Sequence, residues 1–134
     1  MAALKRDPLP LRTEADVVQI RRLVRQQAVQ AGLSLVDQTK LVTAASELGR
    51  NTVVHGGGGT VELEAVKDGP RCGVRLTFMD HGPGIPDVER ALRDGFTTGS
   101  GLGLGLGGAK RLVNQFDIQT CVGEGTRVTI VRWK

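Results

Sequence analysis

The first part of the chain carries hydrophobic residues at helical spacing. Thr13, with Asp16 three positions later, is typical of a helix N-cap, so a helix is expected from there to about Gly32. Its apolar residues recur every three or four positions: Val17, Ile20, Val24 and Ala28. A second helix is expected from about residue 36 to residue 55, after the similar cap Ser34 and before a run of glycines. The pattern therefore predicts two amphipathic helices in succession.

Beyond residue 59 the hydrophobic period becomes that of a strand. Apolar and polar residues alternate around 61–65 and 74–78, which predicts two half-buried strands joined by a turn at 67–70. Short helices around 87–93 and 104–114 follow, and strands at 116–122 and 126–133 finish the chain. An edge strand is expected near residues 9–11. Because consecutive strands are joined by tight turns, we expect an α+β fold in which a mixed, mostly antiparallel sheet has its helices on one face.

Length and composition limit the class of protein. The 134 residues suffice for one hydrophobic core and show no linker, so residues 1–134 are expected to form a single domain. The sequence has no apolar run of membrane-spanning length and no signal-peptide pattern. Two cysteines without metal spacing point to a reduced, cytoplasmic protein. The net charge of +4 allows an acidic partner. A content of only 3% aromatic residues disfavours stacking on nucleic-acid bases, so no nucleic-acid partner is expected. No membrane partner is expected either, because the sequence has no membrane-spanning run.

Glycine is about twice as frequent as in average proteins, and it is clustered at 56–59 and 99–108. The second cluster alternates with leucines just before the helix expected at 104–114. Free backbone N–H groups at a helix N-terminus can cradle phosphate. The cluster matches neither the P-loop pattern nor, in its context, the dinucleotide-binding pattern. The alternative is a flexible loop without special function.

Four polar residues occupy positions where chemistry is conceivable. Glu47 and Asn51 share one face of the second helix, beside its apolar stripe. Asp80 extends the alternation of the second long strand, so its carboxylate points to the core side and needs a partner such as a ligand amino group. Thr126 shares a face with Val128 on the last strand. Each position also has a structural alternative: an exposed Glu/Asn pair, a turn-capping aspartate, or a hydroxyl bonded within its own sheet.

Four motifs in this order resemble those of the GHKL ATPase superfamily, which includes gyrase, MutL and the histidine kinases. The motifs are Glu47-Leu-Gly-Arg-Asn51, Asp80-His-Gly-Pro-Gly84, Gly101-Leu-Gly-Leu-Gly105 and Gly125-Thr126. Over nearly its whole length the chain is similar to the serine/threonine kinases of bacterial partner switching, of the RsbT type. This resemblance implies a Bergerat-type sandwich fold, the cofactors ATP and Mg²⁺, and a role in cytoplasmic stress-response signalling.

The resemblance also implies roles for individual residues. Glu47 corresponds to the general base for the attacking hydroxyl, and Asn51 to the ligand of Mg²⁺ between the phosphates. Asp80 corresponds to the residue that accepts a hydrogen bond from the adenine amino group, with support from Thr126. The remaining cofactor-binding positions are glycines and leucines of two loops: Gly82, Gly84, Gly99, Gly101, Leu102, Gly103, Leu104 and Gly105.

Partners follow from the same resemblance. The implied substrate is a STAS-domain antagonist protein, phosphorylated on serine or threonine, and the released kinase would activate a PP2C-type phosphatase. The alternative is an anti-sigma factor of RsbW or SpoIIAB type, which sequesters a sigma factor and phosphorylates its anti-anti-sigma factor. A nucleotide-gated adaptor is a third hypothesis, which the presence of Glu47 disfavours. The basic side of the first helix (Arg21, Arg22 and Arg25) is either a partner surface or a solvated face.

Overall fold

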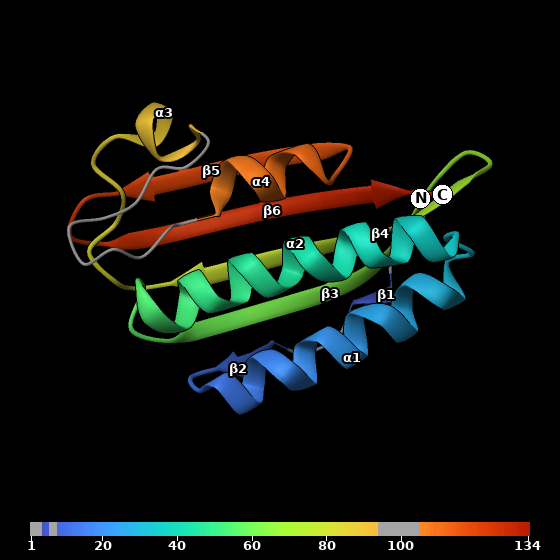
Figure 1. Ribbon diagram of the computed structural model, residues 1–134, viewed down its shortest axis with the longest axis horizontal. Helices are drawn as coiled ribbons and strands as arrows, with labels where there is room; N and C mark the ends of the chain where they lie inside the picture. The colour runs from blue at the N-terminus through green and yellow to red at the C-terminus, as the bar shows by residue number, and fades with distance from the viewer. Residues whose placement is uncertain (1–3, 6–7, 94–104) are drawn as a thin grey trace.

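The computed structural model describes residues 4–5, 8–93 and 105–134, in which six strands and four helices follow one another along the chain (Figure 1). The strands are β1 (Leu4–Lys5), β2 (Leu9–Leu11), β3 (Gly59–Asp68), β4 (Arg71–Asp80), β5 (Gln115–Cys121) and β6 (Gly125–Trp133). The helices are α1 (Glu14–Gln30), α2 (Leu35–Val54), α3 (Val88–Ala91) and α4 (Leu106–Arg111).

The strands form one sheet in the order β1-β3-β4-β6-β5, and β2 also pairs with β3. Every strand pair among the described residues is antiparallel, so the sheet is not mixed in that part of the chain. Helices α1, α2 and α4 lie over one face of the sheet, as Figure 1 shows. The α+β class and the placement of helices on one face are therefore confirmed.

Local capping explains where the two long helices begin and end. The Thr13 hydroxyl accepts a hydrogen bond from Asp16 N at 3.2 Å, and the Asp16 carboxylate accepts from Thr13 N at 3.2 Å. At the start of α2, the Ser34 hydroxyl likewise accepts a hydrogen bond from Asp37 N, at 3.1 Å. At the other end of α2, Gly57 and Gly58 have φ values of +74° and +105°, which only glycine adopts readily. The chain therefore leaves the helix and enters β3 within a few residues.

The hydrophobic core lies between this sheet face and the helices. The sheet contributes Val61, Leu63, Val74, Leu76, Phe78, Val128 and Ile130. The two long helices contribute Val17, Ile20, Val24, Ala28, Leu41, Ala44, Ala45 and Leu48. Burial of each large apolar side chain stabilises the fold by about 1.5–3 kcal/mol before the entropy cost of ordering it. Because side chains alternate along β4, Asp80 lies on the same face as Phe78, at the edge of this core.

An ion pair on the opposite face of the sheet holds β3 against β4. Glu64 and Arg75 are direct cross-strand partners, and their side chains form two hydrogen bonds of 3.1 and 2.7 Å. The Glu64 carboxylate is buried, and its hydrogen bond raises the pKa of the Arg75 guanidinium above its usual value. The pair favours the register in which Asp80 lies opposite Gly59.

The structure differs from the sequence expectation at two elements. The helix expected at 104–114 spans only Leu106–Arg111, because Asn114 N already donates to Val131 O in the sheet. Strand β1 was not predicted, since its two residues are too few to show a period. Both differences arise from pairing with strands that are distant in sequence.

Candidate functional site

Helix α2 carries Glu47 and Asn51 one helical turn apart, beside its buried residues. Both residues are half-buried, and Asn51 lines a pocket beside Leu48. Within the described part of the chain, the Glu47 carboxylate has no hydrogen bond or ion pair, whereas Asn51 has a partner. The structure therefore has these two residues on one half-buried side of α2, as predicted.

Asp80 is the last residue of β4 and is 9% exposed. Its Oδ1 accepts a hydrogen bond from Gly82 N at 2.9 Å, which holds the carboxylate in one orientation. Its Oδ2 has no hydrogen-bond partner among residues 4–5, 8–93 and 105–134. This oxygen is not one of the fully buried polar atoms in the described part of the chain, so a bound molecule can reach it and donate an N–H to it. Asp80 is therefore suited to accept a hydrogen bond from a bound molecule.

The close approach of α2 to Asp80 depends on Gly56, which the sequence interpretation assigned only to a helix stop. A Cβ at Gly56 would lie 2.6 Å from Asp80 Oδ2, well inside van der Waals contact. A Cβ at Gly82 would lie 2.7 Å from Gly56 O, so the two loops pack backbone against backbone. Gly56 is thus a site residue that the sequence did not reveal, because its contact with Asp80 is long-range.

Thr126 lies directly opposite Asp80, as its cross-strand partner on β6, and is 8% exposed. Gly125 makes this possible, because any side chain there would strike the Asp80 carbonyl. The Thr126 hydroxyl is 2.9 Å from the hydroxyl of Thr120, its partner on β5. Asp80, Thr126 and Thr120 therefore form one row across three strands.

The loop that follows β4 is tied to its surroundings on three sides. His55 Nε2 donates to Gly84 O at 3.3 Å, which requires the tautomer with a proton on Nε2. Ile85 N donates to Thr120 Oγ1 at 2.9 Å, and Gly123 N donates to Pro83 O at 2.8 Å. His55 therefore both anchors this loop and forms part of the pocket wall.

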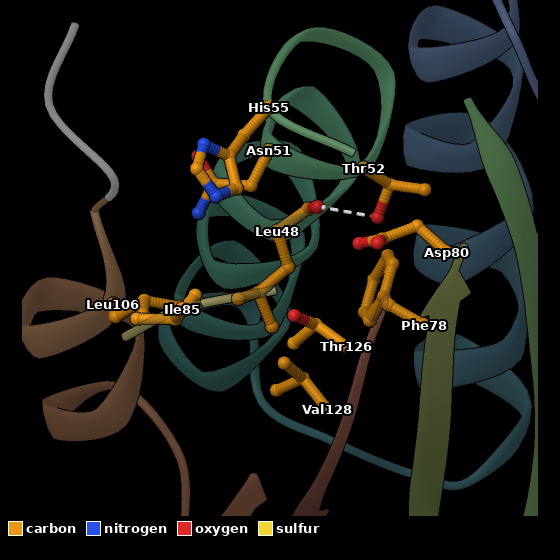
Figure 2. Close-up of a pocket in the computed structure, with 10 residues that line it drawn as sticks. All are labelled: Leu48, Asn51, Thr52, His55, Phe78, Asp80, Ile85, Leu106, Thr126 and Val128. Atoms are coloured by element: carbon orange, nitrogen blue, oxygen red, sulfur yellow. Dashed lines mark hydrogen bonds between the residues drawn. The ribbon is translucent and has the colours of Figure 1, made fainter. Parts of the chain in front are cut away.

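These residues line a pocket between α2 and the ends of β4 and β6 (Figure 2). Its lining residues are Leu48, Asn51, Thr52, His55, Phe78, Asp80, Ile85, Leu106, Thr126 and Val128. The walls are mostly apolar, and Figure 2 shows the Asp80 carboxylate and the Thr126 hydroxyl together among them. This combination suits a flat, largely apolar ring with a polar edge.

Gly105 brings the start of α4 against Glu47. Its φ is +65°, and a Cβ there would lie 3.2 Å from Glu47 Cβ and closer still to Glu47 Oε2. The absence of a side chain at Gly105 therefore leaves the space that the Glu47 carboxylate occupies. The other predicted residues of this loop lie outside the described residues: Gly99, Gly101, Leu102, Gly103 and Leu104.

The donor set near Asn51 bears on whether a metal ion fits here. In the part of the chain that the structure describes, no group of three His, Cys, Asp or Glu side chains could hold a metal. Mg²⁺ commonly keeps several waters and binds through substrate phosphates with few protein ligands. The Asn51 amide in the pocket wall fits that mode of binding, with phosphate oxygens as the other ligands.

Comparison with known proteins assigns the family. Residues 36–134 match the family described as histidine kinase-, DNA gyrase B- and HSP90-like ATPases. The chain is 42% identical over 121 residues to the serine/threonine-protein kinase RsbT of Bacillus subtilis (strain 168), covering 90% of this chain and 91% of that protein. The chain belongs to the RsbT-type kinases of the GHKL ATPase family. The resemblance read from the four motifs, the kinase class and the use of ATP are thereby confirmed.

One further relative and two solved structures are also similar to this chain. An anti-sigma F factor of Anoxybacillus flavithermus is 32% identical over 106 residues, which cover 74% of this chain and 71% of that protein. A Mycobacterium tuberculosis structure of RsbU and RsbW domains shares the fold with a TM-score of 0.65 at 22% identity; the chain spans 33% of that structure. The catalytic domain of the histidine kinase ThkA matches with a TM-score of 0.56 at 14% identity. None of the helices in the described residues is long and apolar enough to cross a membrane.

Proposed function

We propose that this kinase transfers the γ-phosphate of ATP to a serine or threonine hydroxyl of a STAS-domain antagonist protein. The observation that carries the proposal is the arrangement on α2: Glu47 and Asn51 lie one turn apart, and Asn51 lines a pocket together with Asp80 and Thr126. We take residues 1–134 as one kinase domain, which the match over 90% of the chain supports.

The purine end of ATP is assigned to Asp80. Its free Oδ2 would accept a hydrogen bond from the adenine amino group, while apolar walls such as Ile85 and Val128 cover the ring. Gly82 and Gly84 let backbone close around the base. Asp80→Asn keeps the shape but removes the charge, so ATP affinity should fall by about 1.5–3 kcal/mol, more than tenfold. Calorimetry on the variant measures this, and an unchanged dissociation constant would contradict the assignment.

The phosphate end is assigned to the other side of the pocket. Asn51 would bind Mg²⁺, which neutralises phosphate charge, and Gly105 and the predicted glycines before it would offer backbone N–H groups. Glu47 would accept the proton of the attacking hydroxyl, for which its unpaired carboxylate is suited. Phosphoryl transfer needs mainly positioning and charge stabilisation, which this set supplies. Asn51→Ala should abolish the Mg²⁺ dependence of ATP binding; an identical Mg²⁺ titration would contradict the role.

For the partner surface, we retain the exposed basic residues of α1. Arg21 and Arg22 are exposed, whereas Arg25 is half-buried and donates to Gln38 Oε1 at 3.2 Å. The proposal therefore rests on Arg21 and Arg22 as contacts for an acidic surface of the substrate. Activation of a PP2C-type phosphatase by the released kinase, in the cytoplasm, is the second part of the proposed switch.

A second candidate function is an anti-sigma factor. The observation that favours it is the identity of 32% to an anti-sigma F factor over most of both chains. Such a protein would hold a sigma factor and phosphorylate its antagonist, with the same ATP site. The two candidates differ in the protein that stays bound, not in the chemistry.

Affinity capture from the native cell, followed by labelled ATP, separates the two candidates. Recovery of a STAS-domain protein that becomes labelled on serine or threonine, without a sigma factor, is the expected result. A sigma factor in the captured complex would favour the anti-sigma function. Capture of partners without any transfer of label would contradict both and support an adaptor.

A further inference from the structure

We propose that Thr120 is a positioning residue that fixes the direction of the Thr126 hydroxyl proton and thereby makes the pocket selective for a purine with a 6-amino group. The inference rests on the proposed ATP-binding role of Asp80 and Thr126. Thr120 itself lies outside the pocket lining, and it acts through Thr126.

The geometry around the Thr120 hydroxyl is unusually complete. Thr120 Oγ1 accepts from Ile85 N at 2.9 Å, lies 3.1 Å from Gly125 O, and lies 2.9 Å from Thr126 Oγ1. A hydroxyl has one proton and two lone pairs, so three contacts use its full capacity. No rotation of the hydroxyl is left free.

The direction of each proton follows from the chemistry of the partners. Gly125 O is a carbonyl and can only accept, so the Thr120 proton points to it. The backbone N–H of Ile85 can only donate, and it takes one lone pair of Thr120. The remaining contact is filled by the Thr126 proton, which points to Thr120. Thr126 therefore offers only lone pairs toward the pocket.

A pair of side chains that can only accept hydrogen bonds distinguishes purines by the group at position 6. Asp80 Oδ2 and Thr126 Oγ1 come from facing positions on β4 and β6, and both then accept hydrogen bonds. A 6-amino group has two N–H donors and matches them. A 6-oxo group presents its lone pairs to the lone pairs of Thr126, which is a mismatch, although the neighbouring N1–H of a 6-oxopurine still offers Asp80 a donor. Thr120 thus contributes to discrimination without touching the base.

The test compares ATP with inosine triphosphate, which differs at position 6 of the purine. Dissociation constants for both are measured by calorimetry on the full chain and on Thr120→Val, which removes the hydroxyl at nearly constant volume. In Thr120→Val the Thr126 proton is free to turn toward a 6-oxo group. The preference for ATP over inosine triphosphate should then fall about tenfold, the weight of one hydrogen bond.

Three further variants separate positioning from a structural effect. Thr120→Ser keeps the hydroxyl and should restore the wild-type preference. Thr129→Val is a matched change on β6 at a position facing away from the pocket, and it should leave the preference unchanged. Thr120→Ala removes the hydroxyl without adding bulk, and it replaces the valine variant should that protein not fold.

The outcomes distinguish this inference from the proposed function. If the wild type binds ATP and the folded valine or alanine variant keeps the full preference, the role of Thr120 is overturned while the ATP site stands. Equal loss in the serine and valine variants would also overturn it, because the hydroxyl would not be the cause. A wild-type protein that binds neither nucleotide overturns the proposed ATP site and this inference together.

Discussion

The contact between Gly56 and Asp80 gives the sharpest prediction about the purine end of the site. In Gly56→Ala, the new Cβ would lie 2.6 Å from Asp80 Oδ2, whereas ordinary contact begins near 3.4 Å. The carboxylate must therefore move by at least about 0.8 Å, since its Cγ would lie closer still to the new Cβ. The Gly56 backbone cannot retreat instead, because the backbone of Gly82 packs against it.

A shift of that size removes the hydrogen bonds that the carboxylate makes. The bond from Gly82 N to Asp80 Oδ1, now 2.9 Å, would lengthen, and Oδ2 would leave the position proposed for the adenine amino group. Loss of one charge-assisted hydrogen bond is worth about 1.5–3 kcal/mol, which corresponds to an ATP dissociation constant about 10 to 150 times larger. Overpacking also costs about 1–3 kcal/mol of stability.

Calorimetric titration with ATP, on protein shown to be folded by circular dichroism, measures the effect. The control is Gly49→Ala within α2, the helix that ends just before Gly56, where a Cβ would meet Val17 at an ordinary 3.7 Å. That control should bind ATP as the wild type does and gain about 1 kcal/mol of helix stability at most. A folded Gly56→Ala protein with wild-type ATP affinity would refute the argument that Asp80 must be held in this position to bind adenine.

Two further predictions concern catalysis and stability. Gly105→Ala should slow phosphate transfer by about 100-fold, because the new side chain displaces the Glu47 base. The control Gly69→Ala, at a similar positive φ with no neighbour within 4 Å, should lower stability without slowing transfer. Equal transfer rates for the two variants would contradict the steric argument. Arg75→Met should lower the free energy of unfolding in urea by about 2–4 kcal/mol, because the buried Glu64 carboxylate loses two hydrogen bonds and the positive charge beside it. Adding Glu64→Leu to Arg75→Met should recover most of the lost free energy of unfolding. A double variant as unstable as Arg75→Met alone would contradict the claim that the buried Glu64 carboxylate causes the loss.

Much of the fold follows from local sequence patterns. The caps at Thr13 and Ser34 and the alternation along β3, β4 and β6 depend on neighbours within a few residues, so they could be predicted. The length of α4 could not, because it is set by the bond from Asn114 N to Val131 in a distant strand. Local sequence patterns therefore predict which helices and strands form, whereas pairing with a distant strand decides where α4 ends.

The residues of the site also fall into those that the sequence predicts and those that only the fold reveals. Glu47, Asn51, Asp80 and Thr126 could be predicted as one group only through the resemblance of four motifs to a known family. Local patterns alone left each with a structural alternative. The supporting contacts were missed: Gly56 looks like an ordinary helix stop, and Thr120 like any strand threonine, until the fold places them against Asp80 and Thr126.

The central claim is that α2 carries the base of a protein kinase next to its nucleotide. It is tested most directly by Glu47→Gln, which keeps the size of the side chain and removes its ability to accept a proton as a carboxylate. Transfer of labelled phosphate from ATP to the captured substrate is followed in a single turnover, with ATP affinity measured on the same sample. We predict unchanged ATP affinity and transfer slower by about 100-fold or more. Transfer at the wild-type rate would contradict the account.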